Sequence, residues 1–233
     1  MESTTAMGSK GGSFSKILDR LEAFHGPQEP CWPTEPYLFL VWWYCGYPAS
    51  DKACNQGYDS LKKNIGVDPE RLLRAPIPKI AIALKPGGML PELRALRLKE
   101  LASHVTNEFG GDMRAALAGP VQEARKKLKQ FPSIGDPGAD RILLFAGLAP
   151  LAAVPSNCVH VPVRIWHGQE SNNYNKDYRK AQQHIEAEIP AKFDARMRAY
   201  LLLKRHGQEL CKRTNPRCSD CPVSRECEYF KKK

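Results

Sequence analysis

Four cysteines near the end of the chain restrict its fold more than any other feature of the sequence. They follow the spacing Cys211-x6-Cys218-x2-Cys221-x5-Cys227, and the chain has eight cysteines in all. Four thiolates this close can ligate a zinc ion or an iron–sulfur cluster, or pair as disulfides. Structural zinc sites usually combine two Cys-x2-Cys pairs, and here only Cys218 and Cys221 form one. The spacing by itself leaves an iron–sulfur cluster, a zinc ion and disulfides as alternatives.

The chain is strongly basic. Its 35 Lys and Arg against 25 Asp and Glu give a net charge of +10. The excess gathers after residue 201 and in a second cluster of Arg125, Lys126, Lys127 and Lys129. Such a balance favours a polyanionic partner, nucleic acid before an anionic membrane. A solvated basic face that serves only solubility explains the charge equally well.

Two observations bear on the compartment. The longest apolar run, around residues 37–45, is too short to span a bilayer. Residues 1–15 are polar and rich in Gly and Ser, without the apolar core of a secretory signal. We therefore expect a cytoplasmic protein, nucleoid-associated if its source is bacterial, with reduced thiols and no membrane partner. We also expect a monomer.

The apolar pattern predicts an all-α fold. Residues Phe14, Ile17, Leu18, Leu21 and Phe24 have helical spacing, and the apolar, aromatic residues 37–44 indicate a buried central helix. Residues 1–13 are expected to form a disordered tail. The scattered Cys31, Cys45, Cys54 and Cys158 are expected to be small buried residues. We predict helices over residues 14–24, 37–44, 59–65, 68–74, 77–84, 90–109, 113–118, 120–130, 140–147, 175–188 and 193–207.

The cysteine spacing resembles the iron–sulfur loop of the endonuclease III family of DNA glycosylases, within the helix–hairpin–helix (HhH-GPD) superfamily. This resemblance favours an iron–sulfur cluster, then zinc, then disulfides. Residues 199–229 are similar to the C-terminal segment of that family. Upstream, Phe131-Pro132-Ser133-Ile134-Gly135 resembles its Leu-Pro-Gly-Val-Gly hairpin. A Pro/Gly turn before a helix N-terminus exposes backbone N–H groups that can bind phosphate. The resemblance covers residues 36–229 and is densest at the C-terminal end.

The resemblance implies two helical lobes. One would combine residues 14–35 and 158–233 and carry a [4Fe–4S] cluster on Cys211, Cys218, Cys221 and Cys227. The other would span residues 36–157, with the helix–hairpin–helix at about 121–147. The implied partner is double-stranded DNA that contains a modified base, bent across the cleft and with one nucleotide flipped. Expected DNA contacts are the basic cluster at 125–129, Ser133, Ile134, Gly135, Lys212, Arg213 and Arg217.

The chain departs from the family at both catalytic positions. Bifunctional members place a Lys two residues after the last hairpin Gly, where this chain has Pro137. A Val-Asp-Ser-Asn-like stretch carries the family's Asp, and here Val154-Pro155-Ser156-Asn157 puts Pro155 in its place. Proline has no amine for a Schiff base. We therefore expect a monofunctional base-excision-repair glycosylase without AP-lyase activity.

Three side chains are candidates for the catalytic pocket. Asp140 lies one helical turn after the Lys position and could stabilise positive charge on the sugar or activate water, although it could equally pair with Arg141, Arg164 or a hairpin N–H. Tyr47 and Asn157 are candidates to contact the flipped base. His160 and His167 are weaker candidates for proton donors, and Asp136 is expected to cap the following helix. The alternative function is a non-catalytic protein of the same fold that recognises damaged or bent DNA.

Overall fold

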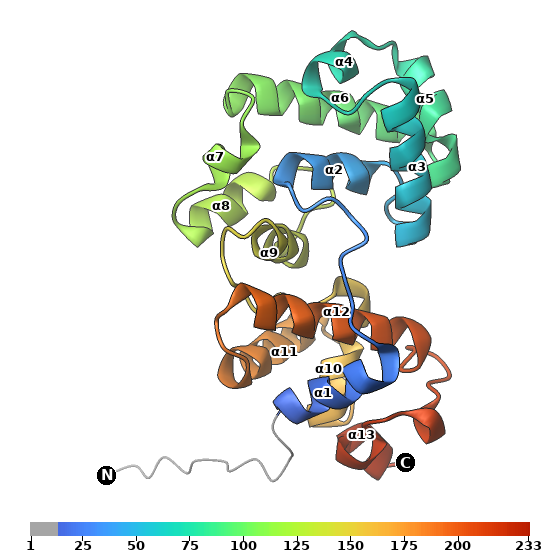
Figure 1. Ribbon diagram of the computed structural model, residues 1–233, viewed down its shortest axis with the longest axis vertical. Coiled ribbons are helices and arrows are strands. Elements are labelled where there is room, and N and C mark those ends of the chain that lie inside the picture. Colours follow the sequence, from blue (N-terminus) through green and yellow to red (C-terminus); the bar gives the residue numbers. More distant parts are fainter. Residues whose placement is uncertain (1–13) are drawn as a thin grey trace. The chain divides into compact units, whose positions relative to one another are not determined.

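The computed structural model describes residues 14–233, and the tail predicted over residues 1–13 lies outside them. The described chain contains helices and turns and no strand, which confirms the all-α prediction (Figure 1). None of its helices combines the length and the apolar character needed to cross a membrane. It divides into two compact units. We call residues 30–150 the central unit, and residues 14–29 with 151–233 the terminal unit.

The central unit is built around one apolar helix. In α2 all residues except Leu38 are buried, and Glu35 caps the helix by accepting a hydrogen bond from the Leu38 N–H at 2.7 Å. Because α2 is apolar on every side, other helices must cover it, and α3, α6, α7 and α9 do so. The unit comprises α2 (Pro36–Tyr44), α3 (Asp51–Asn64), α4 (Pro69–Arg74), α5 (Ile77–Leu84), η1 (Lys85–Gly87), α6 (Pro91–Glu108), α7 (Met113–Leu117), α8 (Val121–Leu128) and α9 (Asp136–Phe145).

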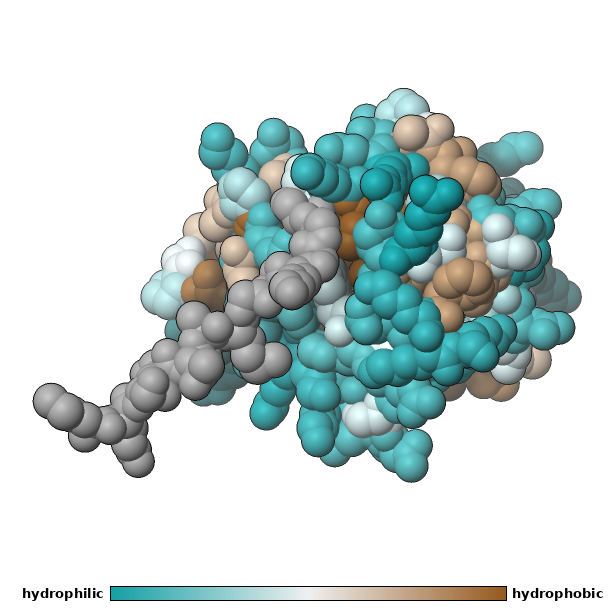
Figure 2. Space-filling view, turned by 90° about the horizontal axis from the view of Figure 1, so that it is seen from below, coloured by the Kyte–Doolittle hydropathy of each residue, from teal (hydrophilic) through white to brown (hydrophobic). Residues whose placement is uncertain are grey.

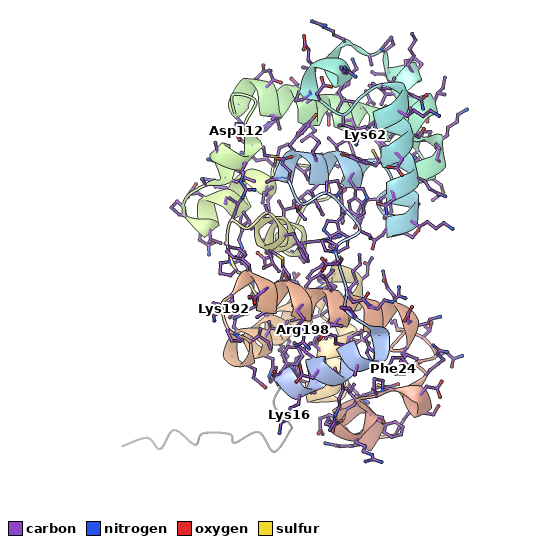
Figure 3. All side chains as sticks on the ribbon, viewed as in Figure 1. Lys16, Phe24, Lys62, Asp112, Lys192 and Arg198 are labelled. Carbon is purple, nitrogen blue, oxygen red and sulfur yellow. The ribbon has the colours of Figure 1, made fainter. Side chains whose placement is uncertain are left out.

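The terminal unit joins the two ends of the described chain. The buried stripe of α1, which includes Phe14, Leu18 and Leu21, packs in one core with residues of α10, α11 and α12. Arg198 of α12, labelled in Figure 3, forms ion pairs with Asp19 and Glu22 of α1 at 2.8 and 2.7 Å. The unit comprises α1 (Phe14–His25), η2 (Ser156–Cys158), α10 (His160–His167), α11 (Tyr174–Glu188), α12 (Phe193–Glu209), η3 (Cys218–Asp220), η4 (Ser224–Glu226) and α13 (Glu228–Lys231).

Several local predictions differ from the structure. Helix α3 begins at Asp51 rather than residue 59, because the Ser50 hydroxyl accepts from the Ala53 N–H and caps a polar first half that shows no apolar stripe. Helices α10 and α13 were not predicted. Pro162 argues against a helix in the sequence of α10. It lies in the first turn, however, where the N–H that proline lacks would have no hydrogen-bond partner within the helix. Cys31 is exposed, whereas the other three scattered cysteines are buried as expected.

Candidate functional site

The helix–hairpin–helix of the central unit consists of α8, the turn at residues 129–135 and α9. Ser133 adopts φ +65°, a conformation that favours glycine and closes the turn tightly. Ile134 is 5% exposed and anchors the turn in the core, while the Tyr44 hydroxyl donates to the Pro132 carbonyl at 2.8 Å. Ser133 and Gly135 therefore stay exposed beside the positive end of α9. This geometry can bind a phosphate.

Two lysines of the basic cluster that was expected to face DNA make contacts within the central unit. Lys129 Nζ donates to Asp136 Oδ1 at 2.7 Å, and Lys127 Nζ donates to the Ala116 carbonyl at 2.6 Å. Asp136 was expected to cap α9 with its side chain. Instead the N-cap residue is Gly135, which makes no side-chain cap, because Asp136 lies inside the first turn and pairs with Lys129. The Lys129–Asp136 ion pair therefore clamps the hairpin turn, and the Lys127 contact joins α8 to α7.

Asp140 lies on α9 inside the central unit. Its side chain is 1% exposed, and Oδ1 accepts from Arg125 Nε at 2.6 Å. Arg125 comes from α8, so the ion pair joins the two helices of the motif. The sequence offered Arg141, Arg164 and hairpin N–H groups as alternative partners, but not Arg125. A spacing of fifteen residues across a turn leaves no periodic signal that would indicate this pair.

An aromatic cluster surrounds the next residue of α9. The Arg141 guanidinium lies 3.8 Å from the Trp32 ring centroid and 4.9 Å from that of Phe39, with Trp42 and Trp43 also within 6 Å. Tyr47 stacks on Trp43 with centroids 3.8 Å apart and planes inclined by 16°. Tyr47 is only half-buried and precedes a cis peptide bond to Pro48. One face of a rigid aromatic stack thus reaches the surface of this unit.

The two positions that depart from the family pattern lie in different units. Pro137 is in the first turn of α9, where proline is well tolerated, and Pro155 is buried just before η2. Asn157, within η2, is exposed. The neighbouring Ser156 carbonyl accepts a hydrogen bond from the Tyr174 hydroxyl at 3.4 Å. Asn157 therefore belongs to the terminal unit, whereas Asp140 and Tyr47 belong to the central unit.

The four clustered cysteines line one hollow in the terminal unit. Its open and enclosed space together amount to about 360 Å³, and its walls include Ile165, Leu210, Val223 and Phe230. Burial raises the pKa of Cys211 to about 11 and that of Cys221 to about 12, and it also raises that of Cys227. These thiols carry protons at neutral pH in the metal-free protein, and metal ligation would displace them.

An all-thiol donor set in an apolar hollow suits a soft metal centre. Among residues 14–233, no three His, Cys, Asp or Glu side chains converge closely enough to hold a single metal ion. The case for a soft metal centre at these cysteines therefore rests on their donor atoms and on the hollow that all four line. The donor set is compatible with a group larger than one ion that brings its own sulfide.

Two side chains of α10 hold the cysteine loop, a role that the sequence analysis did not assign to them. Arg164 donates to the Lys212 and Arg213 carbonyls, both at 2.8 Å, and lies 3.8 Å from Cys211 Sγ. His160, a weak candidate for proton donor, is 2% exposed, and its Nε2 lies 2.6 Å from the Cys211 carbonyl. Both residues come from α10, which was not predicted. The only sequence signal for this role was a charged residue, Arg164, within the apolar segment 161–166.

A chain of histidines reaches the same loop from α1. His206 Nε2 lies 3.5 Å from Cys221 Sγ, and its Nδ1 lies 3.1 Å from His25 Nε2. His25 Nδ1 is 3.1 Å from Glu209 Oε2. Burial lowers the pKa of His206 to about 4, so this ring is neutral at physiological pH. His206 and Arg164 thus bind the loop to α12 and α10, and an ion pair between Arg20 and Glu226 binds it to α1.

The basic residues of the loop remain at the surface. Lys212, Arg213 and Arg217 are all exposed. Arg213 lies 3.6 Å from a Glu170 carboxylate oxygen, and Arg217 donates to the Glu209 carbonyl at 3.2 Å. Hydrophilic residues cover most of the face shown in Figure 2, with apolar residues in separate patches. The three cations are accessible to a polyanion.

Comparison with known proteins identifies the family. No family model matches the chain. A thymine/uracil-DNA glycosylase of Methanothermobacter thermautotrophicus is 30% identical over 165 residues, which cover 70% of this chain and 68% of the relative. This chain belongs to the helix–hairpin–helix superfamily of DNA glycosylases. Within it, the endonuclease III and thymine-DNA glycosylase type is the one that the chain resembles.

Solved structures support the same fold for this glycosylase. The structure of a thermostable thymine-DNA glycosylase matches with a TM-score of 0.74 and 24% identity, covering 94% of this chain and 97% of the other. A non-covalent endonuclease III–DNA complex matches with a TM-score of 0.73 and 17% identity, covering 94% and 95%. The endonuclease III-like fold expected from the hairpin and the cysteine spacing is therefore confirmed.

Proposed function

We propose that this DNA glycosylase excises uracil or thymine from double-stranded DNA during base excision repair. The observation that carries the proposal is the 30% identity to a thymine/uracil-DNA glycosylase over two-thirds of that protein. The hairpin beside the N-terminus of α9 and the exposed cations of the cysteine loop supply contacts for a DNA backbone. Reading a base inside a duplex requires that it be flipped out of the stack, at a cost of a few kcal/mol.

We further propose that the reaction is hydrolytic and monofunctional. Pro137 stands where a Schiff-base lysine would be needed, so water rather than an amine would attack the sugar. The N-glycosidic bond breaks, the water oxygen joins C1′, and the base leaves with a proton. The product is an abasic site in an intact strand. Strand scission would then need alkali or a second enzyme.

Three side chains are proposed to act in base excision, Asp140 and Tyr47 from the central unit and Asn157 from the terminal unit. Tyr47 would stack on a base, and Asn157 would hydrogen-bond to one; both are at least partly exposed. Asp140 would stabilise the positive charge that develops on the sugar. At 1% exposure, with Arg125 bonded to it, this carboxylate would have to be uncovered in order to act. A structural role for Asp140 requires no such change.

We propose a [4Fe–4S] cluster on Cys211, Cys218, Cys221 and Cys227. Their shared hollow and their soft donors support it, and such a cluster would order the loop that presents Lys212 and Arg213. The cluster's role would be structural, with no step of base excision passing through it.

The deciding experiment is base release from single-lesion duplexes that carry uracil, thymine opposite guanine, hypoxanthine, an oxidised pyrimidine or an alkylated purine. Each reaction is read with and without hot alkali, and with borohydride to trap any Schiff base. We expect alkali-dependent cleavage at uracil and thymine and no trapped adduct. Release of only another base would refute the substrate assignment, and a trapped adduct would refute monofunctional chemistry. Tight binding to a duplex without base release from any of them would favour the alternative function, a non-catalytic protein that recognises damaged or bent DNA.

The Asp140→Asn and Tyr47→Ala proteins are assayed beside the wild type, with Tyr47→Phe as the matched control. If Tyr47 stacks on a base, Tyr47→Phe should retain release and Tyr47→Ala should lose it. A folded Asp140→Asn protein that releases bases at the wild-type rate would exclude a catalytic role for this carboxylate.

A further inference from the structure

Two histidines that the proposed function does not use face each other in the terminal unit. His167 ends α10, and His184 lies in α11. Their Nε2 atoms are 3.1 Å apart, and their ring centroids are 4.8 Å apart with planes inclined by 58°. Both side chains are half-buried. Neither histidine lines the cysteine hollow.

The two distances define how the rings converge. A straight N–H···N hydrogen bond of this length would hold the ring centres about 5.4 Å apart, because each centre lies about 1.2 Å behind its nitrogen. Two imidazoles on one metal ion, each at about 2.1 Å and at an angle of about 90–109°, place their nitrogens about 3.0–3.4 Å apart and their centres about 4.6–5.3 Å apart. The observed distances, 3.1 and 4.8 Å, are those of a bent hydrogen bond between the two rings in the metal-free protein, and they also fall in the range for two imidazoles on one metal ion.

Neighbouring side chains fix one of the rings. Trp166 stacks on His184 with centroids 4.8 Å apart and planes inclined by 11°. Phe14 of α1 in turn packs edge-on against Trp166, with centroids 4.6 Å apart. Packing against the core therefore fixes the orientation of the His184 ring. A pre-positioned ligand loses little entropy when a metal binds.

The electrostatic surroundings keep both rings neutral. Burial lowers the pKa of both histidines, and for His167 the nearby His184, Lys180 and Lys232 lower it further, against Asp177. For His184, Glu188 acts in the opposite direction to burial. Neutral imidazole is the form that ligates metals, so the pair is available at physiological pH.

We propose that His167 and His184 form a binding site for a borderline divalent transition metal ion, with Zn²⁺ as the probe and with water in the remaining coordination positions. Imidazole nitrogens suit zinc, nickel and copper better than magnesium or calcium. No third His, Cys, Asp or Glu converges with the pair within residues 14–233, so a bound ion would keep positions open to solvent.

Such an ion would join α10 to α11. Helix α10 follows directly after η2, which holds Asn157, and it also carries the residues that hold the cysteine loop. Because the ion would bind the folded state and not the unfolded chain, it would stabilise the terminal unit in proportion to its concentration. This inference does not depend on the proposed substrate.

The test is calorimetric titration of the full-length protein with Zn²⁺ at neutral pH. The protein is used as purified, and whatever the four clustered cysteines hold is left in place. Wild type is compared with His167→Gln and His184→Gln, and with His104→Gln, which makes the same change in the central unit. We expect one zinc ion per wild-type chain, roughly tenfold or more weaker binding in both pair variants, and wild-type binding in His104→Gln. The melting temperature should rise with zinc only in wild type and His104→Gln.

Two results would overturn the proposal. One is no zinc binding by the wild type at about 1 mM metal, which would set the affinity below any useful range. The other is zinc binding that both pair variants retain, which would place the metal on the cysteines. If a variant fails to fold, long-range ¹H–¹⁵N spectra of the wild type decide the question. Zinc must then shift the Nε2 resonances of two histidines together, and a change in one or none would refute the site.

Discussion

The ion pair between Asp140 and Arg125 should contribute measurably to stability. Replacing one partner of a buried pair costs about 3–5 kcal/mol. Asp140 is 1% exposed and Arg125 is 23% exposed. In Asp140→Ala the Arg125 guanidinium can recover some water, so we expect about 3 kcal/mol, the low end of that range. Arg125→Met leaves the more deeply buried carboxylate without this donor and should cost at least as much.

The Asp140→Asn variant separates charge from shape. Asparagine keeps an oxygen that can accept from Arg125 Nε but removes the negative charge. Since hydrogen bonds to charged groups exceed neutral ones by about 1 kcal/mol, we expect a loss of about 1–2 kcal/mol for this variant. The free energy of unfolding should therefore be highest for the wild type, lower for Asp140→Asn and lowest for Asp140→Ala.

Urea unfolding followed by tryptophan fluorescence measures these losses of stability in the central unit, which contains both residues of the ion pair. Three of the four tryptophans, Trp32, Trp42 and Trp43, belong to the central unit. The double variant Asp140→Ala/Arg125→Met should be less destabilised than the sum of its single changes. If all three single variants unfold within about 0.5 kcal/mol of wild type, the pair does not hold α8 to α9 and the reasoning is wrong.

Three further outcomes are expected. Cys218→Ala should lose the visible absorbance expected from the proposed cluster and bind DNA more weakly, whereas Cys31→Ala, outside the hollow, should do neither. A coloured Cys218→Ala protein would contradict the proposed ligand set. Gly207→Ala should cost about 1–3 kcal/mol in a thermal melt, because its Cβ would lie 2.6 Å from Cys158 Sγ and 2.9 Å from Val161 Cγ2; an unchanged melt would show that the contact relaxes. Acid should destabilise the terminal unit. The pKa of His206 is lowered to about 4 by burial, and burial lowers those of four other histidines of this unit, so the unfolded chain binds protons first as the pH falls below about 6.5. Urea midpoints by circular dichroism should fall from pH 7 to about pH 4, and equal midpoints would contradict the burial of these rings.

The amino-acid sequence determined those features that depend on local spacing. The apolar stripe of α1 and the uniformly apolar α2 have periods that a single segment carries, so their helices and their burial were predictable. The hairpin at 131–135 and the cysteine spacing are contiguous patterns, and they were enough to indicate the family. Elements without a continuous pattern were missed: the polar first half of α3, the proline-containing α10 and the four-residue α13.

Only the tertiary structure decided which side chains meet. Arg125 with Asp140, His25 with His206, and His167 with His184 are pairs whose members lie on different helices, and no sequence period relates them. Such contacts depend on the angle and register at which two helices pack, which the side chains of the whole core set together. For the same reason the basic cluster could be counted from the sequence, but not divided into residues that clamp the hairpin and residues left for DNA.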